Sequence, residues 1–185
     1  MRIVAGAFRG RRLASVGKGD AAAHLRPTTD RVREALFNAL QGGRFGDPIT
    51  DAHVLDLFAG TGALGLEALS RGAADVVFVD DGRAAQALLR ENIAMLDVAG
   101  VTRVLNRSAL RLPAAQKGCT LVFLDPPYGK GLGARALSAA RAGGWVAPGA
   151  LIVWEENAPQ PAPEGFVLLD SRRYGDTTVT LLEAG

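Results

Sequence analysis

The chain has 185 residues, of which 48% are hydrophobic, and a formal net charge of +2. This length and composition allow one domain with a sizeable core and exclude a disordered or fibrous protein. Apolar runs are strand-length and none approaches the roughly 18 residues that cross a bilayer. Because the N-terminus also has no apolar stretch typical of a signal peptide, we expect a cytoplasmic protein. The single cysteine, Cys119, excludes an intramolecular disulfide and a multi-thiolate metal site, and we expect it to be structural.

The charges are unevenly distributed along the chain. Residues 1–50 hold nine Lys or Arg against four Asp or Glu, a net charge of +5. The remaining residues hold twelve against fifteen, a net charge of −3. A basic front segment of this kind indicates a polyanion partner such as a nucleic acid.

Residues 1–45 predict a small basic extension. Two short strands, 2–5 and 11–15, are joined through a glycine-containing reversal and predict a β-hairpin. After a Gly- and Ala-rich loop, Asp30 is a candidate N-cap of a helix that ends at Gly42. Apolar residues at helical spacing define the stripe expected to face the core: Val32, Ala35, Leu36, Ala39 and Leu40. Arg31 and Arg33 fall outside that stripe.

Strand-like and helix-like segments alternate from residue 46 onward, which is typical of parallel α/β architecture. Candidate strands are 54–58, 75–79, 102–105, 120–124, 151–155, 166–170 and 177–183, and candidate helices lie around 63–71, 83–96 and 133–142. Only residues 171–176 separate the last two strands, which predicts an antiparallel hairpin at one end of the sheet. We therefore expect an α/β fold with a Rossmann-like, seven-stranded, mostly parallel sheet whose last strand is antiparallel, and with helices on both faces.

A glycine-rich loop follows the first of these strands. The run Asp56-x-x-x-Gly60-x-Gly62 opens a predicted helix, so its backbone approaches a ligand at the carboxyl edge of the sheet. Gly60, Gly62 and Gly65 match the spacing G-x-G-x-x-G. Asp80 lies twenty residues beyond Gly60, at the end of the next strand, where its two oxygens can accept hydrogen bonds from both hydroxyls of a ribose.

Two cofactors fit this loop. A nicotinamide dinucleotide brings a pyrophosphate, which the carboxylate of Asp56 would repel, whereas S-adenosylmethionine brings an ammonium and a sulfonium. Asp56 thus favours S-adenosylmethionine, and no metal is implied. The alternative for the acidic pair at the end of the second strand is to cap the helix that begins near Gly82. The candidate cofactor contacts are Asp56, Ala59, Gly60, Thr61, Gly62, Asp80, Asp81, Ser108 and Ala109, of which the last two would border the adenine.

The tetrapeptide Asp125-Pro126-Pro127-Tyr128 ends the fourth strand, which neighbours the first across the topological switch point of such a sheet. Consecutive prolines contribute no N–H donors, which leaves the Pro126 carbonyl and the Asp125 carboxylate as acceptors for an amine with two hydrogens. Such acceptors would direct the amino nitrogen of a nucleic-acid base toward a sulfonium methyl, while Tyr128 stacks on the extruded base. We predict catalytic roles for Asp125, Pro126 and Tyr128 and a substrate contact for Pro127. The alternative is that the tetrapeptide merely ends a strand.

Taken together, these residues resemble the class I Rossmann-type methyltransferases, specifically the bacterial 16S rRNA guanine-N2 methyltransferase family. Residues 2–6, 8–11 and 26–38 near the N-terminus discriminate this family, and residues 174–177 also match it. The resemblance implies methyl transfer from S-adenosylmethionine to N2 of one guanine of 16S rRNA within the assembling small ribosomal subunit. It further implies an RNA-contacting extension over residues 1–45 and a methyltransferase domain over 46–185, and we expect a monomer.

The resemblance also assigns roles to individual residues. It places Asp56, Gly60 and Gly62 at the methionine end of the cofactor and Asp80 at its ribose, with Asp125 and Tyr128 at the target guanine. Family members often carry glutamate where Asp80 stands and an acid near Ser108, which is absent here. The candidate phosphate contacts are Arg9, Arg11, Arg12, Arg26, Arg31 and Arg33.

Three other functions remain open. An adenine-N6 methyltransferase acting on DNA or RNA would use the same acceptor pair, because adenine also presents an amino group. A non-catalytic RNA-binding assembly factor would keep only the fold, although the acidic and glycine positions are intact. A nicotinamide-dependent dehydrogenase ranks last, because no residue set suggests a site for the hydride acceptor.

Overall fold

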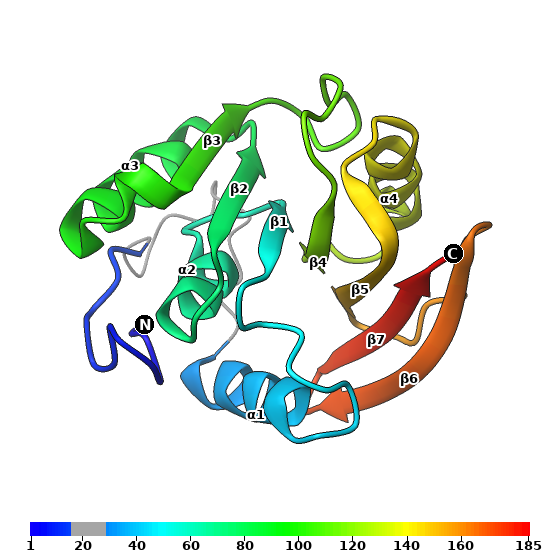
Figure 1. Ribbon diagram of the computed structural model, residues 1–185, viewed down its shortest axis with the longest axis horizontal. Coiled ribbons are helices and arrows are strands. Elements are labelled where there is room, and N and C mark those ends of the chain that lie inside the picture. The colour runs from blue at the N-terminus through cyan, green and yellow to red at the C-terminus, as the bar shows by residue number, and fades with distance from the viewer. Residues whose placement is uncertain (16–28) are drawn as a thin grey trace.

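The structure is a computed structural model that describes residues 1–15 and 29–185. Its strands form one sheet in the order β3-β2-β1-β4-β5-β7-β6 (Figure 1). The strands are β1 His53–Leu57, β2 Asp75–Asp80, β3 Thr102–Asn106, β4 Cys119–Leu124, β5 Val146–Glu156, β6 Phe166–Tyr174 and β7 Thr177–Ala184. The helices are α1 Asp30–Gln41, α2 Ala63–Ser70, α3 Arg83–Leu96 and α4 Leu132–Ala142, with a short 3-10 helix at Ala99–Val101.

Strands β3, β2, β1, β4 and β5 pair in parallel, whereas β7 pairs antiparallel with both β5 and β6. The predicted α/β fold, with a Rossmann-like, mostly parallel sheet and an antiparallel last strand, is therefore confirmed. The chain moves outward from β1 to β3 and then returns to the other side of β1 with β4. Ligands of such sheets bind at this reversal, beyond the carboxyl ends of the strands.

Helices cover both faces of the sheet, as expected. The larger apolar cluster joins α1, α2 and α3 to one face, and the rings of Phe37 and Phe123 lie 5.5 Å apart within it. The second cluster packs α4 against the other face through Ala136, Leu137 and Ala140. Because side chains alternate along a strand, Leu55 belongs to the second cluster and Asp56 points toward α2.

Helix α1 differs from its prediction in its cap and in its buried face. Thr29 is the N-cap, since its Oγ1 accepts the backbone N–H of Val32 at 3.3 Å, and Asp30 is already helical. The buried residues are Arg33, Leu36, Phe37 and Leu40, whereas Ala35 of the predicted stripe is exposed. The face is rotated because Phe37 packs on Phe123 and because a buried carboxylate neutralises Arg33.

The N-terminal segment folds back on itself as predicted, but it does not form two strands. An isolated bridge joins Arg2 and Arg12, and the backbone of Ile3 exchanges hydrogen bonds with Arg11 and Gly10 at 2.9 Å. The backbone N–H groups of Val4 and Ala5 bond to α2 instead of to a partner strand. The expected hairpin is therefore right in its reversal and wrong in the length of its strands.

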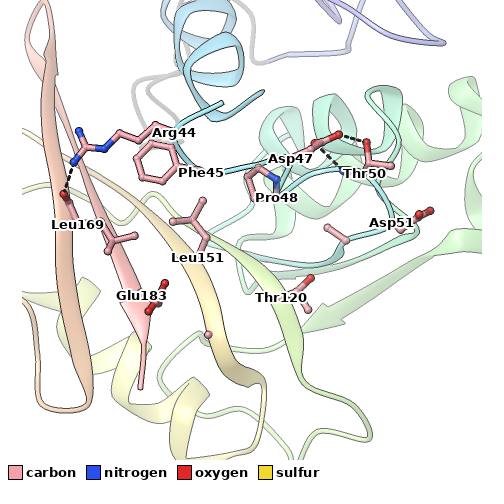
Figure 2. A pocket seen from close by; sticks show the side chains of 12 residues that line it. Arg44, Phe45, Asp47, Pro48, Thr50, Asp51, Thr120, Leu151, Leu169 and Glu183 are labelled. Atoms are coloured by element: carbon pink, nitrogen blue, oxygen red, sulfur yellow. Dashed lines mark hydrogen bonds between the residues drawn. The ribbon is translucent and has the colours of Figure 1, made fainter. Parts of the chain in front are cut away.

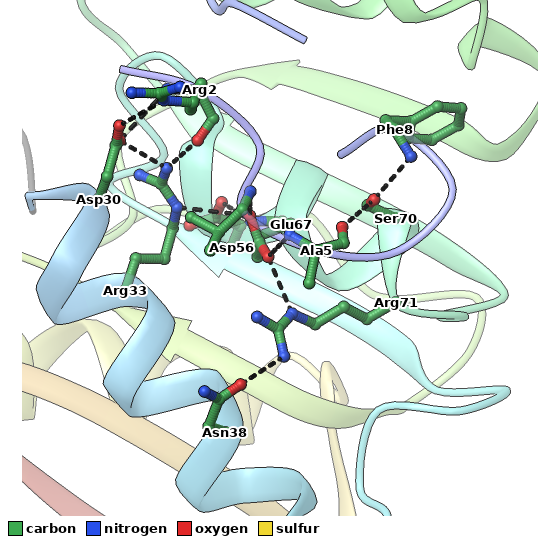
Figure 3. A network of polar contacts seen from close by, with 12 residues as sticks. Arg2, Ala5, Phe8, Asp30, Arg33, Asn38, Asp56, Glu67, Ser70 and Arg71 are labelled. Atoms are coloured by element: carbon green, nitrogen blue, oxygen red, sulfur yellow. Dashed lines mark hydrogen bonds and ion pairs between the residues drawn. The ribbon is translucent and has the colours of Figure 1, made fainter. Parts of the chain in front are cut away.

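Glu67 of α2 is the centre of the polar network that fastens this segment to the sheet (Figure 3). Its buried carboxylate accepts the backbone N–H groups of Val4 at 2.8 Å and Ala5 at 3.1 Å. It also accepts the Nε–H of Arg71 at 2.8 Å and lies 3.5 Å from the Nε of Arg33. Because buried charges need partners, this network fixes the extension and α1 on α2.

Candidate active site

The loop between β1 and α2 has the left-handed backbone that its glycines predict. Gly60 has φ 56° and Gly62 has φ 79°, and Gly62 is the N-cap of α2. A Cβ at Gly62 would lie 2.4 Å from Leu89 Cδ1, so a larger residue does not fit without rearrangement. Phe58 also has a positive φ of 60°, which is strained for an aromatic residue and typical of ligand loops. Sequence reasoning missed Phe58, because nothing in its surroundings marks such a conformation.

Asp56 is buried at the end of β1, and its Oδ2 accepts the N–H of Gly65 at 2.9 Å. Burial raises the pKa of Asp56 to about 8, the Gly65 hydrogen bond partly opposes this rise, and the negative charges of Asp80 and Glu155 add to it. A cationic ligand beside this carboxyl would restore its charge. The observed environment of Asp56 therefore fits the ammonium and sulfonium groups of S-adenosylmethionine.

Asp80 lies at the end of β2 and is bound to two backbone N–H groups. Its Oδ2 accepts from Gly60 and its Oδ1 accepts from Gly82, both at 2.8 Å. Burial raises the pKa of Asp80, while these two hydrogen bonds oppose the rise and neighbouring Asp81, which is exposed, adds to it. A carboxylate oxygen has two lone pairs, so each oxygen of Asp80 keeps one for a ribose hydroxyl. The bond to Gly82 reaches the N-cap residue of α3, but no side chain caps the first turn of this helix, so the capping alternative is not met.

The remaining predicted cofactor contacts lie at the same edge of the sheet. Ala59 and Thr61 are buried within the glycine loop. Ser108 and Ala109 follow β3, whose Asn106 pairs in register with Asp80. Their roles toward a cofactor stay predictions, but the fold gathers these segments at the carboxyl ends of β1, β2 and β3.

Asp125 begins its tetrapeptide directly beside the glycine loop. Its backbone N–H donates to the carbonyl of Leu57 at 3.4 Å, so the two motifs converge at the switch point. The pKa of Asp125 is raised well above its usual value by burial first, and then by the negative charges of Glu155, Asp56 and Glu156. Sequence reasoning missed the two glutamates, although paired acids at the end of an apolar strand were a usable signal.

Tyr128 and the residue after it are held by β7 and β5. The hydroxyl of Tyr128 lies 3.4 Å from Oγ1 of Thr177, the first residue of β7. The N–H of Gly129 donates to the carboxylate of Glu156 at 3.2 and 3.3 Å. These contacts fix the C-terminal end of the tetrapeptide, and the Tyr128 ring remains half-buried.

The predicted phosphate contacts differ in their exposure, and Arg33 is described separately below. Arg9, Arg11, Arg12 and Arg31 are exposed, and Arg11 donates to the carbonyl of Met95 at 2.7 Å. Arg26 lies outside the described residues.

The prediction for Arg33 is wrong. Its side chain is fully buried, bonds to Asp30 at 2.9 Å and to the carbonyl of Arg2, and pairs with Glu67 (Figure 3). A guanidinium enclosed by these groups cannot reach a phosphate in solution. Its position off the apolar stripe suggested exposure only because the buried carboxylate of Glu67 was not apparent from the sequence.

An open cavity of about 640 Å³ lies at the opposite, amino edge of the sheet (Figure 2). Phe45, Thr50, Thr120 and Leu151 are among its lining residues, and none of the predicted site residues is. The side chain of Arg44 crosses it to the carbonyl of Leu169 at 3.2 Å. Since Thr120 is at the start of β4, the cavity is separated from the tetrapeptide by the length of that strand.

Residues 1–15 and 29–185 contain neither a membrane-spanning helix nor a cluster of metal-ligating side chains. No helix there is long and apolar enough to cross a membrane. No group of three or more His, Cys, Asp or Glu side chains in the same ranges is arranged to hold a metal ion. Cys119 is buried, and burial raises the pKa of its thiol to about 12, which agrees with the structural role expected for it.

Comparison with known proteins identifies the family. Residues 1–183 match the family model described as Conserved hypothetical protein 95. The chain is 44% identical over 188 residues to Ribosomal RNA small subunit methyltransferase D of Escherichia coli (strain K12), covering 99% of this chain and 89% of the relative. It is 36% identical over 189 residues to the protein of that name from Haemophilus influenzae, covering 99% and 93%. A solved structure described as putative methyltransferase yhhF from Escherichia coli has a TM-score of 0.82 and 39% identity, covering 100% of this chain and 97% of that one. Relatives named as methyltransferases match nearly the whole length of the chain. The chain therefore belongs to the Conserved hypothetical protein 95 family.

Proposed function

We propose that this protein transfers a methyl group from S-adenosylmethionine to the exocyclic N2 of a guanine in the 16S rRNA of the small ribosomal subunit. The observation that carries the proposal is the approach of Asp125 to Leu57, which brings an amine-accepting tetrapeptide beside a glycine loop. The relatives named Ribosomal RNA small subunit methyltransferase D support the choice of substrate.

The environment of Asp56 supports S-adenosylmethionine as the methyl donor. When bound, this group supplies an electrophilic methyl carbon on a sulfonium. Asp56 and the loop from Ala59 to Gly62 would hold its charged end, and Asp80 would hold its ribose. The carboxyls of Asp80 and Glu155, whose negative charges add to the raised pKa of Asp56, favour a positively charged ligand over a pyrophosphate.

The residues of the tetrapeptide would position the base. The carboxylate of Asp125 and the carbonyl of Pro126 accept hydrogen bonds from the amino group, which orients its nitrogen and favours the geometry in which its lone pair is available. The ring of Tyr128 offers a stacking surface worth roughly 1–3 kcal/mol, comparable with the cost of unstacking a base. Positioning is thus the main catalytic device.

The basic extension supports an RNA partner. Arg9, Arg11, Arg12 and Arg31 are exposed and would contact phosphates without reading sequence. Arg26 and Pro127 remain in the proposal as further contacts with RNA. We propose that residues 1–45 serve this role and residues 46–185 the chemistry, in a cytoplasmic monomer.

The experiment is methylation of unmodified small-subunit particles with labelled S-adenosylmethionine, followed by mass spectrometry of the nucleosides. We expect labelled N2-methylguanosine in 16S rRNA. Labelled N6-methyladenosine would replace the proposal with the adenine alternative. Particle binding without any methylated nucleoside would favour a non-catalytic assembly factor.

A further inference from the structure

Asn92 of α3 connects two segments that are far apart in the sequence. It is fully buried, and its Oδ1 accepts the backbone N–H of Ala14 at 2.7 Å. Its Nδ2 donates to the carbonyl of Ala14 at 3.2 Å and to the carbonyl of Thr61 at 2.9 Å. One amide therefore joins the N-terminal extension to the loop at the proposed cofactor site.

The face of α3 around Asn92 makes two further contacts at the proposed cofactor site, one with the end of β2 and one with the loop. Gln86 donates from Nε2 to the carbonyl of Asp80 at 2.7 Å. Leu89 occupies the space into which a Cβ of Gly62 would project. Residues 86, 89 and 92 are spaced by three and all are buried, so they form one face of the helix. Asn92 also bonds to the extension, through Ala14.

At Ala14, the extension is tied to the loop through a single side chain. Both polar groups of the Ala14 backbone bond to the same amide, so a shift of Ala14 breaks two hydrogen bonds at once. The remaining bond to Thr61 would then hold an amide with unsatisfied polar atoms in a buried position, which is costly. Arg9, Arg11 and Arg12 lie just before Ala14 and are exposed. A change in the position of the extension when these arginines bind a ligand would therefore alter the hydrogen bond of Asn92 to Thr61 in the loop.

We propose that Asn92 is a positioning residue that couples the RNA-contacting extension to the cofactor loop. Whichever ligand binds first pays for ordering the Ala14–Asn92–Thr61 contact, and the second ligand then binds more tightly. Because coupling is reciprocal, RNA strengthens cofactor binding by the same factor as cofactor strengthens RNA binding. This inference rests on the proposed function, since it requires S-adenosylmethionine at the loop and RNA at the extension.

The test measures the dissociation constant of S-adenosylhomocysteine, a non-reactive probe, by equilibrium dialysis with and without unmodified small-subunit particles. For the wild-type protein we expect the particles to tighten binding about 5-fold or more. Asn92→Ala removes all three hydrogen bonds, and Asn92→Asp removes the two that Nδ2 donates. In both variants, the ratio of the dissociation constant without particles to that with particles should be close to 1.

Ser70→Ala is the matched control. The Ser70 hydroxyl accepts the N–H of Phe8 at 2.9 Å and donates to the carbonyl of Ala5, so the variant loosens the extension at the far end of α2. It does not touch the loop. We expect weaker particle binding with the wild-type ratio preserved.

The outcomes separate this inference from the proposed function. A ratio near 1 for the wild-type protein, with methylation intact, overturns the coupling alone. A wild-type ratio in both Asn92 variants shows that the residue is merely structural and also overturns it. If Asn92→Ala does not fold by circular dichroism, the Asn92→Asp ratio decides, because that variant keeps the acceptor for Ala14. Failure of the wild-type protein to bind S-adenosylhomocysteine overturns the proposed function and the inference with it.

Discussion

Asp56 is buried in its folded environment, where its pKa is about 8 against the ordinary value of 3.8. A carboxyl whose folded-state pKa is raised contributes stability that is fully present below the unfolded pKa and is lost as pH rises through the folded pKa. The relevant window therefore extends from about pH 4 to about pH 8. A cationic ligand should have the opposite effect, since it favours the ionised form.

We predict that Asp56→Asn makes the fall in melting temperature between pH 5 and pH 8 shallower than in the wild-type protein, because the amide does not ionise. Asp51→Asn is the control, because Asp51 is exposed. Thermal denaturation followed by circular dichroism at several pH values measures both slopes. An unchanged slope in Asp56→Asn would show that this carboxyl does not control the pH dependence.

We predict that Asp125→Ala lowers kcat roughly 100-fold or more while leaving the affinity for S-adenosylmethionine within a few-fold, because it removes an acceptor needed for orienting the base. Asp80→Ala should show the opposite pattern, since it removes the proposed ribose contact. Steady-state kinetics and calorimetry separate the two effects. Comparable loss of both quantities in Asp125→Ala would indicate a chiefly structural residue.

Asp125 also predicts a pH dependence of the reaction. Its carboxyl accepts the hydrogen bond of the amino group more strongly when it is ionised, and its pKa is raised by burial and by three neighbouring carboxyls. We expect kcat/KM to rise with pH and to level off above the usual range for Asp. A rate that is flat from pH 5 to pH 9 contradicts this role.

At the scale of the element, the buried carboxylate of Glu67 joins α2 to both the extension and α1. Glu67→Ala would leave Arg33 without its buried anion and would free two backbone N–H groups. Breaking one side of a buried ion pair costs about 3–5 kcal/mol. We predict a loss of that size by urea denaturation, whereas Glu34→Ala on the exposed face of α1 changes stability by less than about 0.5 kcal/mol. Equal losses in the two variants would contradict the importance of the network.

Most elements were predictable because apolar periodicity decides their type. The exceptions have physical causes. β5 begins at Val146, five residues before its predicted start, because Pro148 and Gly149 mimic a loop and the pairing of β4 with β5 shifts between Cys119 and Leu121. β6 continues to Tyr174 through charged residues, which an edge strand tolerates.

The candidate site was predictable where a motif marks a special backbone, as in the glycine loop and the tetrapeptide. It was not predictable where long-range packing decides a role. The position of Arg33 outside the apolar stripe predicts a surface cation. Its buried partner Glu67 is 34 residues away in the sequence, so no local pattern indicates the pairing. For Glu155 and Glu156 the paired acids at the end of an apolar strand were a local signal, but their position beside Asp125 depends on the pairing of β5 with β4.

At the scale of the whole molecule, we predict that the double substitution Arg9→Gln and Arg12→Gln raises the KM for small-subunit particles and flattens its salt dependence. Each lost phosphate contact lowers the slope of log K against log salt by about 0.7–0.9. Arg103→Gln with Arg135→Gln, on β3 and α4, is the matched control, because both side chains are exposed away from the extension. Arg11 is left intact because it holds the end of α3. An identical salt slope in both double variants would remove RNA contact from the extension.

The carboxyl groups of Asp56, Asp80, Asp125, Glu155 and Glu156 gather at one edge of the sheet, while the arginines of the extension stand outside it. A phosphodiester is repelled by the first group and attracted by the second. Under the proposed function, the nucleic-acid strand would therefore stay at the rim, and an uncharged ring swung away from its own backbone would enter. Under the proposed function, a bound sulfonium would favour the ionised form of these carboxyls, and their charge would then act as a filter against the polymer to which the substrate belongs.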